Sequence, residues 1–176
     1  MSKLSIFICL LVHFFECTGQ IQYNKIDLFC PDGQDCFEAL NDSMSLYRIA
    51  NHKGLIAIVF PTSVIVYGKS RFDIQKEIVP LFNSDLKYAS LNVVGIELYS
   101  VKLENKEMVV IKGLLQGSSG ISASYHLILI FDISNLNKKK AYGFLSKQFN
   151  IKNIRDENND GQLEIIEEGT TFEFDK

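Results

Sequence analysis

Two shortages in this sequence narrow its function before any motif is considered. After residue 20 there is no apolar run of the roughly 20 residues that a membrane-spanning helix needs. Histidine is also scarce, because only His52 and His126 of the 3 histidines follow residue 20. The first shortage argues against stable membrane insertion, and the second leaves little material for acid–base catalysis. We therefore expect a soluble protein that is not an enzyme.

A serine nucleophile is the remaining catalytic candidate. Ser119 lies in Gly-Ser-Ser-Gly at residues 117–120, which lacks the G-x-S-x-G pattern of a nucleophile elbow. A flexible connection between two strands explains this tetrapeptide without a catalytic pair of Ser119 and His126. A small secreted hydrolase or an enzyme inhibitor whose site carries no recognisable motif is the alternative function.

Cysteine is limited to 4 residues, of which only Cys30 and Cys36 follow residue 19. In an oxidising compartment a disulfide is the expected state of such a pair. Cys30 and Cys36 flank a Pro-Asp-Gly turn, which brings the chain back on itself and favours a disulfide between them. A metal site would need more cysteine or histidine ligands than this pair, and a redox pair would normally be spaced C-x-x-C. We predict a structural disulfide.

The first 19 residues have the pattern of a secretory signal peptide. Lys3 precedes an apolar run over residues 4–15, and small residues precede a cleavage point after Gly19. We do not expect a lipid anchor at Cys17, because Phe14, Phe15 and Glu16 fit a lipoprotein signal poorly. The sequence thus predicts a signal peptide over 1–19 and a single secreted domain over 20–176, either extracellular or periplasmic.

Basic residues cluster only at Lys138, Lys139 and Lys140. Without a basic stripe or an aromatic platform, this cluster is typical of a solvated turn, and nucleic-acid binding is not expected. Asn41 begins an Asn-Asp-Ser glycosylation sequon, which would matter only in a eukaryotic host.

Apolar residues alternate with polar ones more often than they follow a helical period, so strands should dominate. Two hairpins are expected, one joining 55–60 to 64–67 and one joining 96–103 to 108–111. A strand over 122–131 should be half-buried at its start and buried on both faces at its end.

Helical spacing is more plausible over 37–50 and over 73–82, where Pro80 interrupts the stripe. The predicted fold class is therefore α+β, a single domain that is mainly antiparallel β-sheet with one or two helices.

Oxygen-bearing side chains occur at alternate positions around a glycine in residues 156–167. The pattern D-x-[DN]-x-[DN]-G is typical of calcium loops, because Ca²⁺ needs six to eight oxygen ligands at about 2.3 to 2.6 Å. We therefore predict a bound Ca²⁺ as cofactor. Its predicted ligands are Asp156, Asn158, Asp160, Gln162, Glu164 and Glu167.

Negative charge is concentrated in the same region. Residues 155–176 contain eight acids against Arg155 and Lys176, so eight negative and two positive charges leave −6, whereas the whole chain has −3. A divalent cation would relieve part of this repulsion. The alternative is a plain β-turn, since Asn-Asp-Gly at 159–161 readily adopts the positive φ angles of a tight turn.

Two calcium architectures fit the spacing. In a helix-loop-helix EF-hand, Asp156 would be position one, Gly161 position six and Glu167 position twelve. However, Gly169 and two threonines interrupt the segment that should form the exiting helix, and residues 150–154 are a poor entering helix. A hairpin over 150–175 with the loop between its strands fits these flanks better.

Residues 154–166 resemble the calcium loops D-x-[DN]-x-D-G-x-x-[DE] of FG-GAP and VCBS-type repeats in secreted and cell-surface proteins. The resemblance covers about 12 of the 176 residues. It implies that the side chains of Asp156, Asn158 and Asp160 coordinate the ion. It also implies coordination by the backbone carbonyl of Gln162 and by Glu164 from the ninth position. Aspartate is more usual at the ninth position, so Glu164 would coordinate through water. Those families repeat the motif around a propeller, for which this chain is too short, and we carry over the loop alone.

Together these features predict a secreted, non-enzymatic module stabilised by calcium. Its partner would be an extracellular protein or a glycan, bound on exposed loops that need no catalytic groups.

Overall fold

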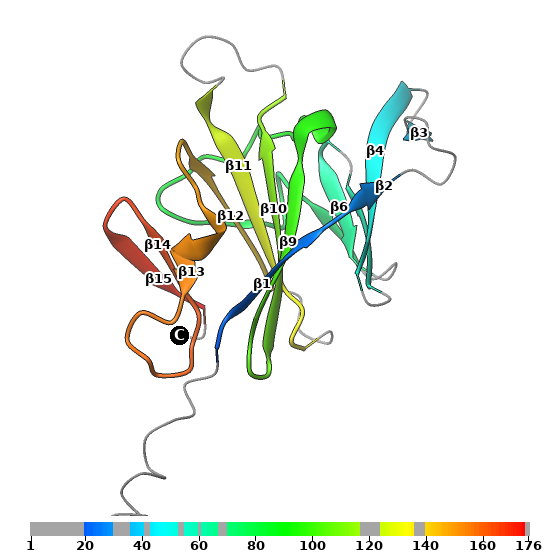
Figure 1. Cartoon of the computed structure of the whole chain (residues 1–176). Helices are drawn as coiled ribbons and strands as arrows, with labels where there is room; N and C mark the ends of the chain where they lie inside the picture. The colour runs from blue at the N-terminus through cyan, green and yellow to red at the C-terminus, as the bar shows by residue number, and fades with distance from the viewer. Residues whose placement is uncertain are drawn as a thin grey trace, which may run out of the picture.

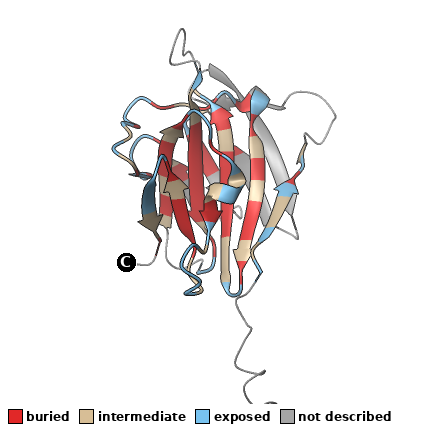
Figure 2. Cartoon of the chain, turned by 60° about the vertical axis from the view of Figure 1, so that its left-hand side comes forward, coloured by how far each residue is buried: buried red, intermediate tan, exposed pale blue. Residues whose placement is uncertain are grey.

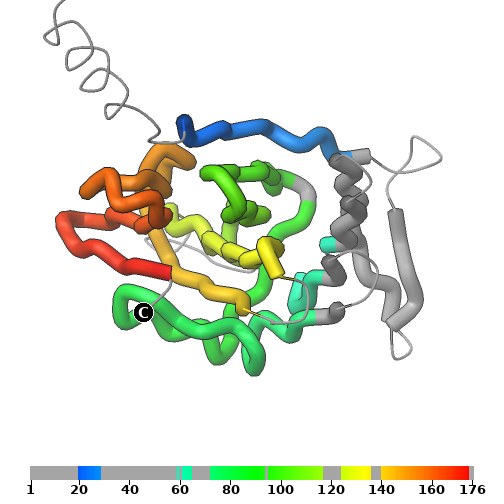
Figure 3. The backbone as a smooth tube through the Cα atoms, turned by 90° about the horizontal axis from the view of Figure 1, so that it is seen from below, coloured from blue at the N-terminus to red at the C-terminus, as the bar shows by residue number. Residues whose placement is uncertain are grey.

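The described residues form three β-sheets stacked in three layers (Figures 1 and 3). A six-stranded central sheet lies between a second sheet and a small three-stranded sheet that contains the acidic loop. The structure is a computed structural model that describes residues 20–29, 36–40, 43–52, 55–59, 61–66, 70–116, 124–135 and 140–174.

The central sheet has the strand order β1-β9-β10-β11-β12-β8. All its strand pairs are antiparallel except the short contact of β8 with β12. Strands β9 to β12 follow one another along the chain, so neighbours in sequence are also neighbours in the sheet. The bounds are β1 Gln22–Ile26, β8 Val79–Pro80, β9 Glu97–Leu103, β10 Lys106–Leu114, β11 His126–Asp132 and β12 Lys140–Ser146.

The second sheet has the order β2-β4-β5-β6-β7, with β3 paired to β4 outside this path. Its strands are antiparallel. The bounds are β2 Leu28–Phe29, β3 Cys36–Leu40, β4 Ser43–His52, β5 Leu55–Val59, β6 Ser63–Val66 and β7 Ser70–Asp73.

The small sheet consists of β13 Ile154–Arg155, β14 Glu164–Glu167 and β15 Thr170–Glu173, all antiparallel. Glu168 and Gly169 alone connect β14 to β15, with φ angles of 48° and 80°. Positive φ at both central residues is the signature of a type I′ turn, whose twist matches that of the strands it joins. This turn sets the pairing of β14 with β15.

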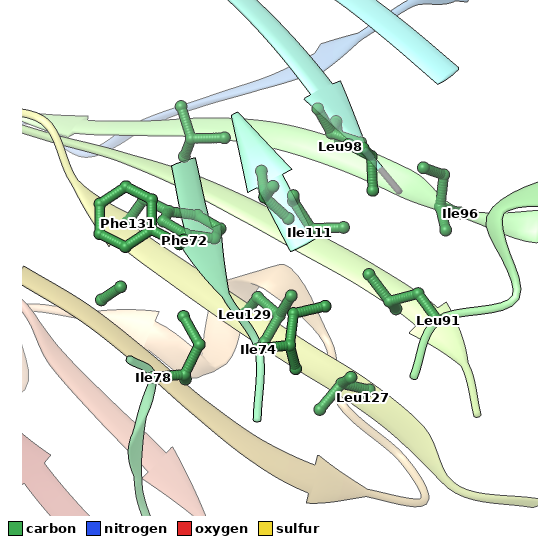
Figure 4. Close-up of a cluster of buried hydrophobic side chains, with 14 of the residues drawn as sticks. Phe72, Ile74, Ile78, Leu91, Ile96, Leu98, Ile111, Leu127, Leu129 and Phe131 are labelled. Atoms are coloured by element: carbon green, nitrogen blue, oxygen red, sulfur yellow. The ribbon is translucent and has the colours of Figure 1, made fainter. Parts of the chain in front are cut away.

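Alternate residues of the central sheet point into two different cores. Figure 2 shows how much of the length of these strands is buried. In β11, Leu127, Leu129 and Phe131 contribute to the first core, which the central sheet shares with the second sheet (Figure 4). Ile128 and Ile130 contribute to the second core, which the central sheet shares with the small sheet. Burial of both faces explains why β11 reads as a continuous apolar run.

Both predicted hairpins are confirmed within the described residues. The first is formed by β5 and β6, over 55–59 and 63–66, and the second by β9 and β10. Its turn is shorter than expected, because Lys106 already pairs with Leu103. The strand expected over 122–131 is confirmed only from His126, where β11 begins, because Ser124 and Tyr125 precede the strand and residues 122–123 lie outside the described ones. Residues 127–131 are all buried.

The helix expected over 37–50 is wrong, because residues 37–40 and 43–50 belong to the paired strands β3 and β4. Leu40 pairs with Ser43, so only Asn41 and Asp42 separate the strands in the sequence. Asparagine and aspartate favour turns over helix interiors, and a hairpin with this dipeptide between its strands outweighs the weak helical spacing.

The helix expected over 73–82 is also wrong. The backbone N–H of Glu77 donates to the carbonyl of Asp73 at 2.9 Å, so a single helical turn forms after β7. It ends at β8, whose Pro80 has no N–H to continue a helix. The described residues contain no α-helix, and none of their helical turns could cross a membrane.

Several predictions concern residues outside the described ones. These are the signal peptide over 1–19, Cys30 of the predicted disulfide, the sequon residue Asn41, Ser119, and the lysines at 138 and 139. Of the basic cluster only Lys140 is described, at the start of β12.

We predict that Gly143→Ala destabilises the fold by about 1 to 3 kcal/mol, the usual cost of overpacking a core. A Cβ at this position of β12 would lie 2.8 Å from Ile78, 2.9 Å from Leu86 and 3.1 Å from Leu129. Chemical denaturation measures the effect. Gly95→Ala is the matched control, because a Cβ there meets nothing within 4 Å. Equal stabilities of the two variants would contradict the packing described.

Candidate metal centre

The acidic loop spans residues 156–163 and joins β13 to β14. Its ends are fixed by the pairs Ile154↔Ile165 and Arg155↔Glu164. Ile154 and Ile165 are fully buried in the second core, so the strands on either side hold the loop in place. The hydroxyl of Tyr23 in β1 donates to the carbonyl of Ile154 at 2.6 Å, immediately before the loop.

Asp156 closes the loop by accepting hydrogen bonds from two backbone groups further along it. Its two carboxylate oxygens accept from the N–H of Asp160 and of Gly161, each at 3.0 Å. Asn159 and Gly161 have φ angles of 58° and 82°, which turn these N–H groups towards Asp156. Asparagine and glycine are the residues that adopt such angles at least cost.

Asn158 and Asp160 lie on the exposed side of the loop. The side chain of Asn158 accepts from the N–H of Asp160 at 3.0 Å and donates to the Asp160 carboxylate at 3.1 Å. The other oxygen of Asp160 accepts from the N–H of Gln162 at 2.9 Å. Gln162 is therefore in the loop as predicted, and its described hydrogen bond is made by its backbone.

Glu164, the first residue of β14, is buried with only 2% of its surface exposed. Its Oε2 accepts from the N–H of Glu157 at 2.7 Å. Burial raises the pKa of Glu164, the Glu157 N–H opposes that rise, and the charges of Asp160, Asp156 and Glu173 add to it. Among the described residues no cationic side chain pairs with Glu164.

Three of the six predicted ligands meet. Oxygens of the Asp156, Asp160 and Glu164 carboxylates all lie within 4.8 Å of one another. Two oxygens that each bind one Ca²⁺ at about 2.4 Å can be at most about 5 Å apart. The three carboxylates are thus close enough to bind one hard cation, with Asn158 and Gln162 in the same loop.

Glu167 is not part of this group. Glu164 and Glu167 are three residues apart in a strand, so their side chains point to opposite faces. The carboxylate of Glu167 accepts from the hydroxyl of Ser146 and, at 3.2 Å, from the side-chain amide of Asn153. Glu167 therefore connects β14 to the central sheet. It acts neither as the twelfth-position ligand of an EF-hand nor as another ligand of this loop.

Sequence reasoning missed Glu173, which lies directly opposite Glu164 in the pairing of β14 with β15. Its charge contributes to the raised pKa of Glu164. Only the two-residue turn at 168–169 brings the two glutamates together, and the spacing of the loop motif carries no sign of it. The Glu168-Gly169 turn was the one available signal.

Strands flank the loop on both sides, as expected from the sequence. The helix-loop-helix arrangement of an EF-hand is absent here, because the loop is followed by β14 and preceded by β13 and a single 3-10 turn, η3, at Ile151–Asn153. Comparisons of the chain with protein-family models, curated proteins and solved structures gave no match.

In the presence of chelator, we predict that Glu164→Gln raises the melting temperature at pH 7 by about 3 °C. This corresponds to removing on the order of 1 kcal/mol of the cost of a buried charge. A raised pKa means that ionisation of Glu164 weakens the fold, a cost absent below the ordinary pKa of glutamate and complete above the raised one. The gain should therefore shrink as the pH falls towards 4. Glu104→Gln, at an exposed turn, is the control, and a loss of stability in Glu164→Gln would contradict the prediction.

We predict the opposite pattern for Glu167→Ala. The substitution leaves the buried Ser146 hydroxyl and the Asn153 amide without their acceptor, which should cost about 3 kcal/mol. Any rise in melting temperature on adding calcium should be the same as in the unmodified protein. Loss of that rise would instead make Glu167 a ligand.

Proposed function

We propose that the protein is a secreted, non-enzymatic binding or interaction module stabilised by Ca²⁺ in the acidic loop. The ligands would be the side chains of Asp156, Asn158, Asp160 and Glu164, the last directly or through water, and the backbone carbonyl of Gln162. The observation that carries the proposal is the convergence of three carboxylates within 4.8 Å.

The burial of Glu164 supports a cation at this place. A carboxylate that is 2% exposed and faces three further acids is costly to keep ionised, and no described cationic side chain compensates it. The nearest basic residue by sequence, Arg155, pairs instead with Glu157 at 2.5 Å. A divalent ion would offset the charges of Asp156, Asp160 and Glu164 together.

A plain turn accounts for part of the same geometry. The hydrogen bonds of Asp156 and Asp160 to backbone N–H groups close the loop without any ion. They give no reason, however, for a buried acid at Glu164 beside the other carboxylates. A bound Ca²⁺ explains both the turn closed by Asp156 and Asp160 and the buried carboxylate of Glu164. We therefore prefer the calcium site to a plain turn.

The structural part of the proposal follows from where the loop is attached. Leu163, 2% exposed, packs into the second core directly before Glu164. An ion that orders the loop would therefore hold the end of the small sheet against the central sheet. The partner would be an extracellular protein or a glycan, bound on exposed loops of this rigid scaffold.

We predict that millimolar Ca²⁺ raises the melting temperature above the value in chelator with Mg²⁺ present. A ligand at 100 times its Kd stabilises by about 2.7 kcal/mol, or roughly 5 to 10 °C for a chain of this length. Asp156→Ala and Asp160→Ala should each abolish the rise while leaving a folded protein, because neither side chain lies in a core.

Asp85→Asn is the matched control for these variants. Asp85 is exposed and accepts a hydrogen bond from the N–H of Lys87 at 3.0 Å, the same kind of local turn but away from the loop. It should keep the full calcium response. If both aspartate variants of the loop also keep it, the acidic loop is only a turn and the proposed function fails.

A further inference from the structure

His126 begins β11 on the face that looks towards the second core, two residues before Ile128. Its Nδ1 is buried and has no hydrogen-bond partner in the part of the chain that the structure describes. Three neighbouring strands supply the groups that act on it: Ser146 lies directly opposite on β12, and Lys112 of β10 and Glu97 of β9 act through their charges.

Ser146 connects this place to the small sheet. It is 2% exposed, and its hydroxyl donates to Glu167 while accepting from the N–H of Gln148 at 3.2 Å. Glu167 is the last residue of β14, the strand whose first residue is Glu164. The position of Ser146 thus determines whether Glu167, at the end of β14, keeps its hydrogen bond to the central sheet.

Protonation would change the balance of forces at His126. The neutral ring leaves Nδ1 unpaired, whereas the protonated ring adds a buried N–H without an acceptor and a positive charge near Lys112. Burial lowers the pKa of His126 and Lys112 lowers it further, while Glu97 and the backbone of Ser146 act in the opposite direction. Glu97 is already paired with Lys112 at 3.5 Å and with Lys25 of β1 at 3.4 Å, so a protonated His126 would be a third cation near the same carboxylate.

We propose that His126 makes the fastening of the small sheet sensitive to mild acid, because its protonated ring displaces the end of β11 and β12 that positions Ser146 against Glu167. At pH 7.5 the His126 ring is neutral and the contact of Ser146 with Glu167 is formed. The contact weakens in mild acid, where histidine gains a proton while free carboxylates remain ionised. Glu164 of β14, whose pKa is raised, also gains a proton as the pH falls, and the comparison with His126→Gln separates the two effects.

Hydrogen–deuterium exchange of the protein in chelator at pH 7.5 and 5.5 tests this, so the outcome does not depend on calcium. After correction for the intrinsic pH dependence of exchange, amides of residues 164–173 should exchange about fivefold faster at pH 5.5, within the range of measured coupling between neighbouring networks. In His126→Gln this acceleration should disappear.

His52→Gln is the matched control, because it removes a histidine from β4 of the second sheet and should keep the acceleration. Lys112→Met removes the cation that lowers the pKa of His126, so its acceleration should begin at a higher pH, and this variant tests the proposal even if His126→Gln folds poorly. The same acceleration in His126→Gln as in the unmodified protein, or no acceleration in the unmodified protein, would overturn the proposal.

Discussion

Burial of the central sheet on both faces is the constraint on which the other features depend. Strands β10 and β11 place apolar side chains alternately into the first and the second core. A sheet of this kind needs a covering layer on each side, since neither face can remain in water. The small sheet is one of those layers, and its attachment determines where the acidic loop lies. The candidate metal centre is therefore a consequence of core packing as well as of its own spacing.

The strands could be predicted because their apolar residues are local and regular. The apolar runs at 127–131, 55–60 and 64–67 are short and rich in β-branched residues, and Pro61 separates the last two, which together favour strands. The two predicted helices failed where the spacing was ambiguous and a turn signal outweighed it, at Asn41-Asp42 and at Pro80. The three-layer arrangement was not accessible, because nothing local in the sequence says that residues 154–174 pack on the face formed by β9 to β12.

The loop ligands could be predicted to the extent that they are consecutive. Asp156, Asp160 and Glu164 follow from the motif, and the structure brings their carboxylates together. Glu167 fits the same spacing and yet faces the other way, since a strand after the loop reverses the side chain that a helix would have turned inwards. Glu173 reaches the site through strand pairing across a turn. Long-range pairing is what a short motif cannot encode.

The bond from Tyr23 to the carbonyl of Ile154 has a kinetic meaning. It joins positions 131 residues apart in the sequence, whereas β9 to β12 can form as successive hairpins between neighbours. Closing so long a loop carries the largest entropy cost among the described side-chain hydrogen bonds, so it should follow the local pairings. The edge strand β1 and the segment before the loop then meet late, on a sheet that already exists. In a growing chain, that contact also cannot precede the synthesis of Ile154, and the central sheet must wait for its second cover until then.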